Sequence, residues 1–200
     1  MPIQNIFPIP IFYQDNILSN DNYNLLRTYL YDHFTLEERN AFYQSPGFLQ
    51  ELEEFQECKK IIETIASEFY TSIGFKSQSF FITQMWANYS TGNGAISEHY
   101  HSNSMISGVL YIDVENHNKT GFTCPYQDLK ILRTDVEKTT EYTTDTFYAG
   151  SKNNRIILFP SYISHFSDNQ NIDKTRLTIS FNLLPKELGN KTHLNYYKFM

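Results

Sequence analysis

Three histidines and one arginine are the residues of this chain whose types and spacing predict chemistry. His99 and His101 are two positions apart, so on a β-strand both imidazoles would project from the same face. His165 comes much later, after a strand-like segment, and Arg176 opens the next strand-like segment. Two close ligands, one distant ligand and then a buried cation are the layout of a mononuclear iron site that holds a dicarboxylate.

Imidazole nitrogens suit Fe(II) and Mn(II), and a redox iron needs open positions beside its protein ligands. A lone His-x-His pair is weak evidence, and each histidine could be an ordinary core or surface residue. The later His165 and the Arg-x-Thr segment favour the metal site. A ligand set in which Asn103 replaces His99 stays open, because Asn103 is the next residue in phase. Glu98 is expected to point outward from the opposite face.

An arginine fork matches a carboxylate with two parallel hydrogen bonds, so Arg176 is the candidate for holding the dicarboxylate. Thr178 shares its strand face and could donate a further hydrogen bond. The alternative is a surface ion pair between Arg176 and Asp173. The remaining histidines are expected to be solvated: His33, His117 and His193.

Composition and charge limit the class of protein. The 16% aromatic content favours a β-rich interior, and the formal charge of −6 argues against binding to duplex nucleic acid. Cys58 and Cys124 form no CxxC pair, which argues against a disulfide scaffold or a thiolate zinc site. The first residues carry no basic, apolar leader, and no apolar run reaches membrane-spanning length. We therefore expect an intracellular, cytoplasmic protein without a membrane partner.

The first part of the chain predicts helices. Ile6–Tyr13 is expected as an edge strand because Pro8 and Pro10 are tolerated there. Ser19 could cap a helix that runs to about Asp32. A long amphipathic helix is expected from about Phe48 to Ile73, ended by Gly74, with Cys58 on its apolar side.

From Ser79 onward the pattern changes to short strands separated by turn signals. About eight are expected: Phe80–Tyr89, Ile96–His101, Ile106–Val114, Phe122–Tyr126, Ile131–Leu132, Thr139–Phe147, Arg155–Phe159 and Arg176–Leu184. Such a set after two helices predicts a mainly β fold with flanking α-helices, a double-sheet jelly roll. One domain over 1–200 is the simplest organisation, with a helical part at about 1–78, a core at about 79–184 and a tail at 185–200.

At these motifs the chain resembles the 2-oxoglutarate and Fe(II)-dependent oxygenases. It looks most similar to a small uncharacterised group found in phages and bacteria, which extends the expected location to the cytoplasm of an infected host cell. The matching segments are Trp86-Ala87-Asn88-Tyr89, Glu98-His99-Tyr100-His101, Ser107–Ile112, Phe159-Pro160-Ser161 with His165, and Arg176–Asn182. The resemblance implies the double-stranded β-helix fold, a cupin-like jelly roll.

The resemblance also implies roles. Fe(II) would bind catalytic His99, His101 and His165, and 2-oxoglutarate would chelate it through its keto acid end. Arg176, assisted by Thr178, would hold the distal carboxylate. The implied chemistry is hydroxylation of an unidentified prime substrate by O2, with decarboxylation of 2-oxoglutarate to succinate. The candidate pocket liners are Asn88, Tyr89, Tyr111 and Asn182.

One position departs from the family pattern. The superfamily usually carries His-x-Asp, whereas His101 occupies the second position here. A three-histidine site loses one negative charge, which should change iron affinity and potential. It also favours an alternative, a cupin-type metal protein such as a cosubstrate-free dioxygenase or isomerase, which would not need Arg176. A non-catalytic structural or binding jelly roll is the third hypothesis.

Loops and the tail carry the remaining expectations. Specificity for the prime substrate should come from residues 92–97, 115–122 and 129–145 and from the N-terminal helices. Residues 129–138 could form a lid or an exposed hairpin. The aromatic tail at 196–200 could pack on its own domain or on a second subunit.

Overall fold

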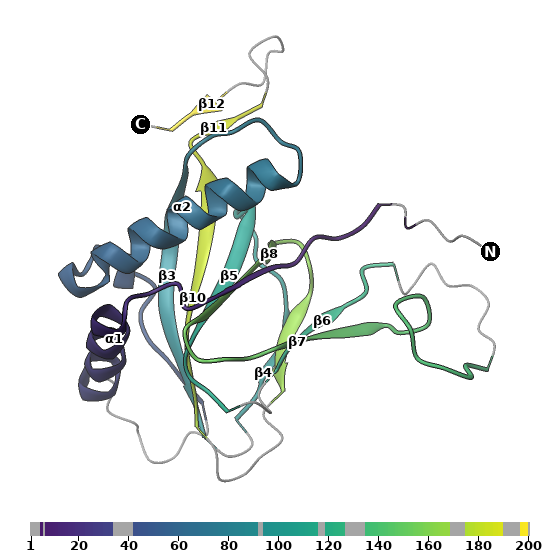
Figure 1. The fold of residues 1–200 in the computed structure, drawn as a ribbon, viewed down its shortest axis with the longest axis horizontal. Helices are drawn as coiled ribbons and strands as arrows, with labels where there is room; N and C mark the ends of the chain where they lie inside the picture. The colour runs from purple at the N-terminus through teal and green to yellow at the C-terminus, as the bar shows by residue number, and fades with distance from the viewer. Residues whose placement is uncertain are drawn as a thin grey trace.

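The computed structural model describes residues 5, 7–33, 42–91, 94–115, 119–126, 135–168, 175–189 and 197–199. Within them, two antiparallel sheets face each other (Figure 1). The large sheet has the order β1 (Phe12–Asp15), β8 (Arg155–Pro160), β5 (Ile106–Asp113), β10 (Arg176–Pro185), β3 (Phe80–Ser90) and β2 (Phe42–Gln44). The small sheet has the order β4 (Ile96–His99), β9 (His165–Asp168), β6 (Lys119–Thr123) and β7 (Thr146–Gly150).

Helix α1 (Asn20–His33) begins where the sequence predicts. The Ser19 hydroxyl accepts a hydrogen bond from the Asn22 backbone N–H at 3.3 Å, which caps the first turn. Leu26 and Leu30 bury the inner side of the helix. The side facing the sheet is thus apolar at four-residue spacing.

Helix α2 (Gln56–Ser72) starts later than predicted. Two short 3-10 turns, Leu49–Glu51 and Glu53–Phe55, occupy the expected first turns, because Leu52 between them has an extended backbone. Gly74 ends the segment as expected, with a positive φ of 96°. Cys58 lies in the core, as predicted, and burial raises the pKa of its thiol to about 12.

Several strand predictions were shifted or wrong. Strand β1 is an edge strand, as expected, but it begins after both prolines, which cannot donate to a ladder. The segment predicted as a strand over Thr139–Phe147 is mostly turn, because Thr143 and Thr140 bond each other locally. Strands β2 and β9 were not predicted, and Ile131–Leu132 lies outside the described residues.

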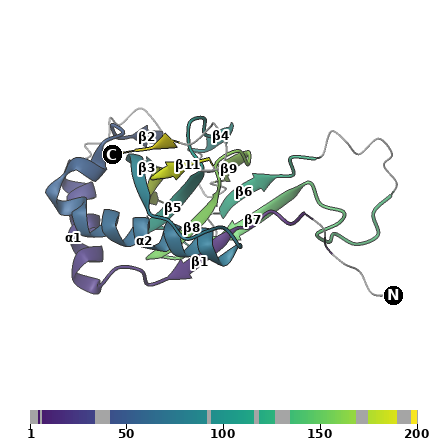
Figure 2. The same ribbon diagram turned by 90° about the horizontal axis from the view of Figure 1, so that it is seen from above.

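Strand β10 has two chemically different faces. The face under the helices is apolar and belongs to the larger core cluster: Leu177, Ile179, Phe181 and Leu183. The face toward the small sheet is polar and also buried: Arg176, Thr178, Ser180 and Asn182. Figure 2 shows α1 and α2 on one side of the large sheet, with β4, β9 and β6 on the other. The mainly β fold with flanking helices is therefore confirmed, and the polar face of β10 lies between the sheets, beside a second, smaller hydrophobic cluster.

The end of the described chain packs against its own body. Strand β12 (Tyr197–Lys198) pairs with β11 (Glu187–Leu188), and the Phe199 ring lies 5.7 Å from the Phe81 ring, centre to centre. Among the described residues, no helix is both long and apolar enough to cross a membrane.

Candidate metal centre

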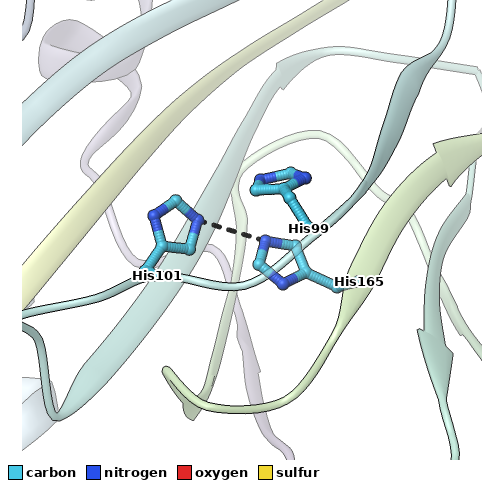
Figure 3. A group of neighbouring side chains, drawn as sticks. All are labelled: His99, His101 and His165. Atoms are coloured by element: carbon cyan, nitrogen blue, oxygen red, sulfur yellow. Dashed lines mark hydrogen bonds between the residues drawn. The ribbon is translucent and has the colours of Figure 1, made fainter.

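Three histidines converge at one end of the space between the sheets (Figure 3). His99 ends β4 and is the direct cross-strand partner of His165, the first residue of β9. His101 lies beyond the end of β4, held by its backbone N–H bond to the Ser161 carbonyl at 3.0 Å. The expectation that His99 and His101 share one strand face was therefore wrong. Even so, one ligand nitrogen from each histidine lies within 4.8 Å of the others.

Backbone carbonyls orient two of the three rings. His99 Nδ1 lies 2.7 Å from the Ser97 carbonyl oxygen, and His165 Nδ1 lies 3.0 Å from that of Ile163. A carbonyl can only accept, so each Nδ1 carries the proton when the ring is neutral. Each Nε2 then presents a lone pair, as in metal-binding histidines whose other nitrogen is anchored.

The spacing of the nitrogens fits a shared ion. His101 Nε2 and His165 Nε2 lie 3.3 Å apart (Figure 3). Two nitrogens bound at right angles and 2.0–2.1 Å from one metal would be about 3 Å apart. Burial lowers the pKa of His165 to about 3 and that of His101 to about 4. Both rings are therefore neutral at pH 7 and able to donate to a metal.

A cavity of about 360 Å³ joins the histidines to Arg176. Its walls carry polar groups from the inner face of the large sheet, together with aromatic rings. The ring of Trp86 lies 5.6 Å from that of His101. Other residues that line it include Asn88, Thr120, Phe159 and Ser180. The size suits a small polar ligand.

Arg176 lies in this cavity as a buried cation with few partners. It is 3% exposed, and one guanidinium nitrogen donates to the Thr178 hydroxyl at 3.3 Å. Among the described residues, its Nε has no hydrogen-bond partner and its guanidinium forms no ion pair. Burial lowers its pKa, and the neighbouring Tyr111 opposes that effect. A buried, unpaired cation is costly, so the cavity favours an anionic ligand.

The burial of Arg176 rules out the surface ion pair that was the alternative, and Asp173 lies outside the described residues. Tyr111 packs behind the arginine, with its ring centre 5.8 Å from the guanidinium carbon and its hydroxyl 2.7 Å from the Thr120 hydroxyl. Tyr111 thus supports the cation and is fully buried.

The other expected pocket liners divide between the two faces of the sheet. Asn88 lines the cavity, donates to the Ser180 hydroxyl at 2.8 Å, and leaves its Oδ1 without a partner. Tyr89 faces the helices, where its ring meets that of Tyr31, so the expectation that Tyr89 lines the pocket was wrong. Adjacent residues of a strand point to opposite faces, which excludes Asn88 and Tyr89 from one pocket.

Two neighbours of the histidines lie outside the centre. Glu98 is exposed and is not one of the clustered ligands, as expected, but it does line the cavity. Hydrogen bonds from Thr123 and Ser164 lower its pKa. Asn103 is exposed in the turn after His101, with a positive φ of 56°, so the strand phase that suggested it as a ligand does not exist. His33 is exposed at the end of α1, while His117 and His193 lie outside the described residues.

Sequence reasoning missed Ser180 and Thr120 in the cavity. Ser180 could have been predicted from the sequence, because polar residues recur at every second position from Arg176 to Asn182 and so share one strand face. Thr120 carried none, since it lies on β6 and reaches the cavity only through pairing with β9.

A second, larger cavity of about 1100 Å³ borders His101 on its other side. None of the described residues that line it is Asp, Glu, Lys or Arg. The lining includes exposed rings and apolar side chains from several separate segments of the chain: Pro8, Pro10, Phe69, Ile73, Tyr100, Met105, Tyr162 and Leu188.

Comparison with known proteins agrees with this geometry. A family model described as "Putative 2OG-Fe(II) oxygenase" matches residues 84–182, which include the three histidines and Arg176. No curated protein sequence matches the chain.

Solved structures resemble this chain in fold. The alpha-ketoglutarate-dependent epimerase SnoN from nogalamycin biosynthesis aligns with a TM-score of 0.65 and 9% identity over 90% of this chain and 77% of its own. HygX from Streptomyces hygroscopicus, solved with nickel and 2-oxoglutarate, gives 0.61 and 9% over 88% and 83%. A prolyl-4-hydroxylase from Pseudomonas putida gives 0.57 and 10% over 87% and 92%. The predicted jelly roll and the predicted resemblance to the 2-oxoglutarate and Fe(II)-dependent oxygenases are thereby confirmed.

Proposed function

We propose that this protein is an Fe(II) and 2-oxoglutarate-dependent oxygenase that hydroxylates a substrate still to be identified. The observation that carries the proposal is one cavity with two unlike ends. Three imidazoles converge at one end, and the buried Arg176, which forms no ion pair with any described residue, lies in the same cavity. A metal-chelating keto acid with a second carboxylate would satisfy both features at once.

The residues divide the work of binding. His99, His101 and His165 would hold Fe(II) through nitrogens, and Arg176 with Thr178 would hold the distal carboxylate. Bound iron and 2-oxoglutarate would together supply the O2 chemistry, with succinate and CO2 as the products of the cosubstrate. Trp86 and Phe159 would exclude water from the cavity walls, and the free Asn88 Oδ1 could accept a hydrogen bond from a ligand.

The three-histidine set leaves the metal with no protein carboxylate, so its full positive charge faces the cavity. That charge strengthens the attraction for an anionic chelate, which supports a cosubstrate here. The cosubstrate-free cupin alternative has no use for Arg176, although burying a guanidinium that forms no ion pair with a described residue costs stability.

The second cavity is where we expect the prime substrate to bind, because it reaches His101 from outside. Its described lining is mainly apolar and contains no Asp, Glu, Lys or Arg, which favours an uncharged, apolar part of the substrate. Replacing Tyr162, 61% exposed there, with Ala should weaken substrate binding and leave 2-oxoglutarate binding unchanged.

Three small anions test the cosubstrate by calorimetry on anaerobic, Fe(II)-loaded protein. 2-Oxoglutarate should bind most tightly. Glutarate lacks the keto group and pyruvate lacks the distal carboxylate, so each should bind far more weakly. In Arg176→Ala, 2-oxoglutarate should bind no better than pyruvate. Equal binding of 2-oxoglutarate and pyruvate by the unaltered protein would contradict the proposal.

Hydroxylation is tested separately from cosubstrate use. Product mass distinguishes a hydroxylase, which adds one oxygen atom, from an epimerase, which leaves substrate mass unchanged. Succinate formation with no oxygen added to any substrate would leave the oxygenase assignment in place and overturn hydroxylation.

A further inference from the structure

His101 is the one member of the three whose second nitrogen faces a side chain. Its Nδ1 lies 3.3 Å from the amide of Asn182, whereas His99 and His165 each face a backbone carbonyl. Asn182 lies on the polar face of β10 and is 5% exposed. A backbone carbonyl fixes the proton on a ring by itself, but an amide can either donate or accept. What orients the amide therefore decides which nitrogen of His101 is free for a metal.

A chain of serine hydroxyls contacts the far side of that amide. Ser107 Oγ lies 2.8 Å from Asn182 Oδ1 and 2.8 Å from Ser161 Oγ. Ser161 Oγ lies 2.8 Å from Ser104 Oγ. The Ser104 hydroxyl ends the chain at two backbone carbonyls, 3.0 Å from that of Ile106 and 3.3 Å from that of Leu183.

The carbonyl end sets the direction of every bond in this chain. Ser104 must donate to a carbonyl, because a carbonyl cannot donate, so Ser104 accepts from Ser161. Ser161 has then used its hydrogen and accepts from Ser107. Ser107 has likewise used its hydrogen, so it needs a donor from the amide of Asn182.

The structure has Nδ2 of Asn182 toward His101 and Oδ1 toward Ser107. Four oxygen–oxygen contacts then run in series from the Ile106 carbonyl through Ser104, Ser161 and Ser107 to Oδ1 of the amide. The three serines supply only three hydrogens, so one of the four contacts has no hydrogen between its oxygens. Turning the amide end for end gives Nδ2 to Ser107 and supplies the fourth hydrogen. The two ends of an amide have the same shape, so the hydrogen-bond network decides between them.

We propose that Asn182 is a positioning residue that, held by the serine chain, turns its oxygen toward His101 Nδ1. The ring then carries its proton on Nδ1, and Nε2 points its lone pair at the metal beside His165 Nε2. Gln84, exposed at 3.4 Å from the same amide, can rotate its own end to match. This inference rests on the metal site proposed above and gives Asn182 a role other than contact with 2-oxoglutarate.

A double-mutant cycle on metal affinity tests the inference, with Co(II) as the probe in competition with a coloured chelator. Ser107→Ala removes the acceptor that holds the amide, so affinity should fall about 10-fold, the low end for losing a residue that orients a ligand. Asn182→Asp presents acceptor oxygens only, so it keeps the proton on His101 Nδ1 without help. In the Asn182→Asp background, Ser107→Ala should therefore change affinity by less than about 2-fold.

Ser151→Ala is the matched control, because Ser151 is also buried and donates to a backbone carbonyl, that of Glu115, away from the cavity. It should leave Co(II) affinity unchanged in both backgrounds. An equal loss from Ser107→Ala in both backgrounds would overturn the inference, since the serine would then act on packing alone. If Ser107→Ala does not fold, Ser161→Ala breaks the same chain one step further away.

The proton itself gives a second readout in Zn(II)-loaded, nitrogen-15-labelled protein. The His101 Nδ1 proton should exchange slowly with water, like that of the buried His165, and should exchange quickly in Asn182→Leu. Equal exchange in the two proteins would contradict the role of Asn182. A protein that binds neither Co(II) nor Zn(II) would overturn the metal site itself, so the two failures are distinguishable.

Discussion

The two faces of strand β10 are both buried, but one carries apolar side chains and the other carries polar ones. Leu177, Ile179, Phe181 and Leu183 pack under the helices in one continuous core. The residues between them, Arg176, Thr178, Ser180 and Asn182, are equally shielded from water but polar. Burial alone does not separate the two faces, so the difference lies in whether the buried atoms have partners.

On the helix-covered face of β10, the side chains pack closely. A side-chain carbon added at Gly108 would meet the Phe181 ring at 2.5 Å and the Ile157 carbonyl oxygen at 2.7 Å. On the inner face, polar atoms lack partners: Arg176 Nε and Asn88 Oδ1. The partnerless polar atoms of the inner face are the reason for assigning a ligand to that face.

The largest expected effect falls on the inner side. His165→Ala removes a ring whose nitrogen meets those of His99 and His101. Metal affinity should fall by more than about 100-fold, beyond the range typical of losing a residue that only orients a ligand. Chelator competition with Co(II) measures this. The control is His33→Ala, an exposed histidine on α1, and an equal loss in both variants would contradict the assigned site.

Arg176→Leu should separate ligand binding from stability. Leaving the distal carboxylate of 2-oxoglutarate buried and unpaired costs about 3–5 kcal/mol, at least about a hundredfold in affinity. The unfolding free energy of the ligand-free protein should hold or rise, because an unpaired buried charge is removed. Calorimetry and urea unfolding measure the two. A large loss of stability with 2-oxoglutarate affinity intact would show that Arg176 has a structural role and does not bind the ligand.

Gly108→Ala should act mainly on stability and much less on ligand binding, the reverse of Arg176→Leu. The new methyl group would clash with the Phe181 ring and a backbone oxygen, so the free energy of unfolding should fall by about 1–3 kcal/mol. Gly108 also lines the cavity, but the clash is with Phe181 and the Ile157 carbonyl and not with a histidine, so metal affinity of the folded fraction should fall far less than in His165→Ala. Gly74→Asn, at a site with open space and a positive φ, is the control and should cost less.

The smallest effect is on the pH dependence of metal-free stability. The pKa values of His101 and His165 are lowered to about 4 and about 3 in the folded protein, against about 6.5 in an unfolded chain. Between these values the unfolded chain binds more protons, so stability is full above about pH 6.5 and declines as pH falls toward 4. Thermal melts at pH 7.5 and 5 measure this. A decline just as steep in the His101→Ala, His165→Ala double variant would assign it to other groups.

The sequence predicted the identity of the candidate site residues better than the strands, turns and register that bring them together. Arg176 and Thr178 were placed on one face by strand periodicity, and the structure agrees. His101 reaches the site from a turn, because β4 ends at His99, and nothing local in the sequence marks that end. The pairing of His99 with His165 is set by a register between distant segments, which periodicity cannot give.

Other errors have equally local causes. Tyr89 could have been excluded from the pocket on sequence alone, since its neighbour Asn88 already faced inward. The late start of α2 reflects the extended Leu52, which interrupts an otherwise regular apolar pattern. The serine chain behind Asn182 was invisible, because Ser104, Ser107 and Ser161 come together only through the pairing of β5 with β8.

The most direct test of the central claim is an anaerobic titration of Fe(II)-loaded protein with 2-oxoglutarate, followed by visible absorption. A chelate of the keto acid on iron gives a weak charge-transfer band. We expect that band in the unaltered protein, its loss in His165→Ala, and its loss at the same 2-oxoglutarate concentration in Arg176→Ala with iron still bound. An iron-loaded protein that shows no band at saturating 2-oxoglutarate would contradict the proposed cosubstrate and favour a cosubstrate-free metal site.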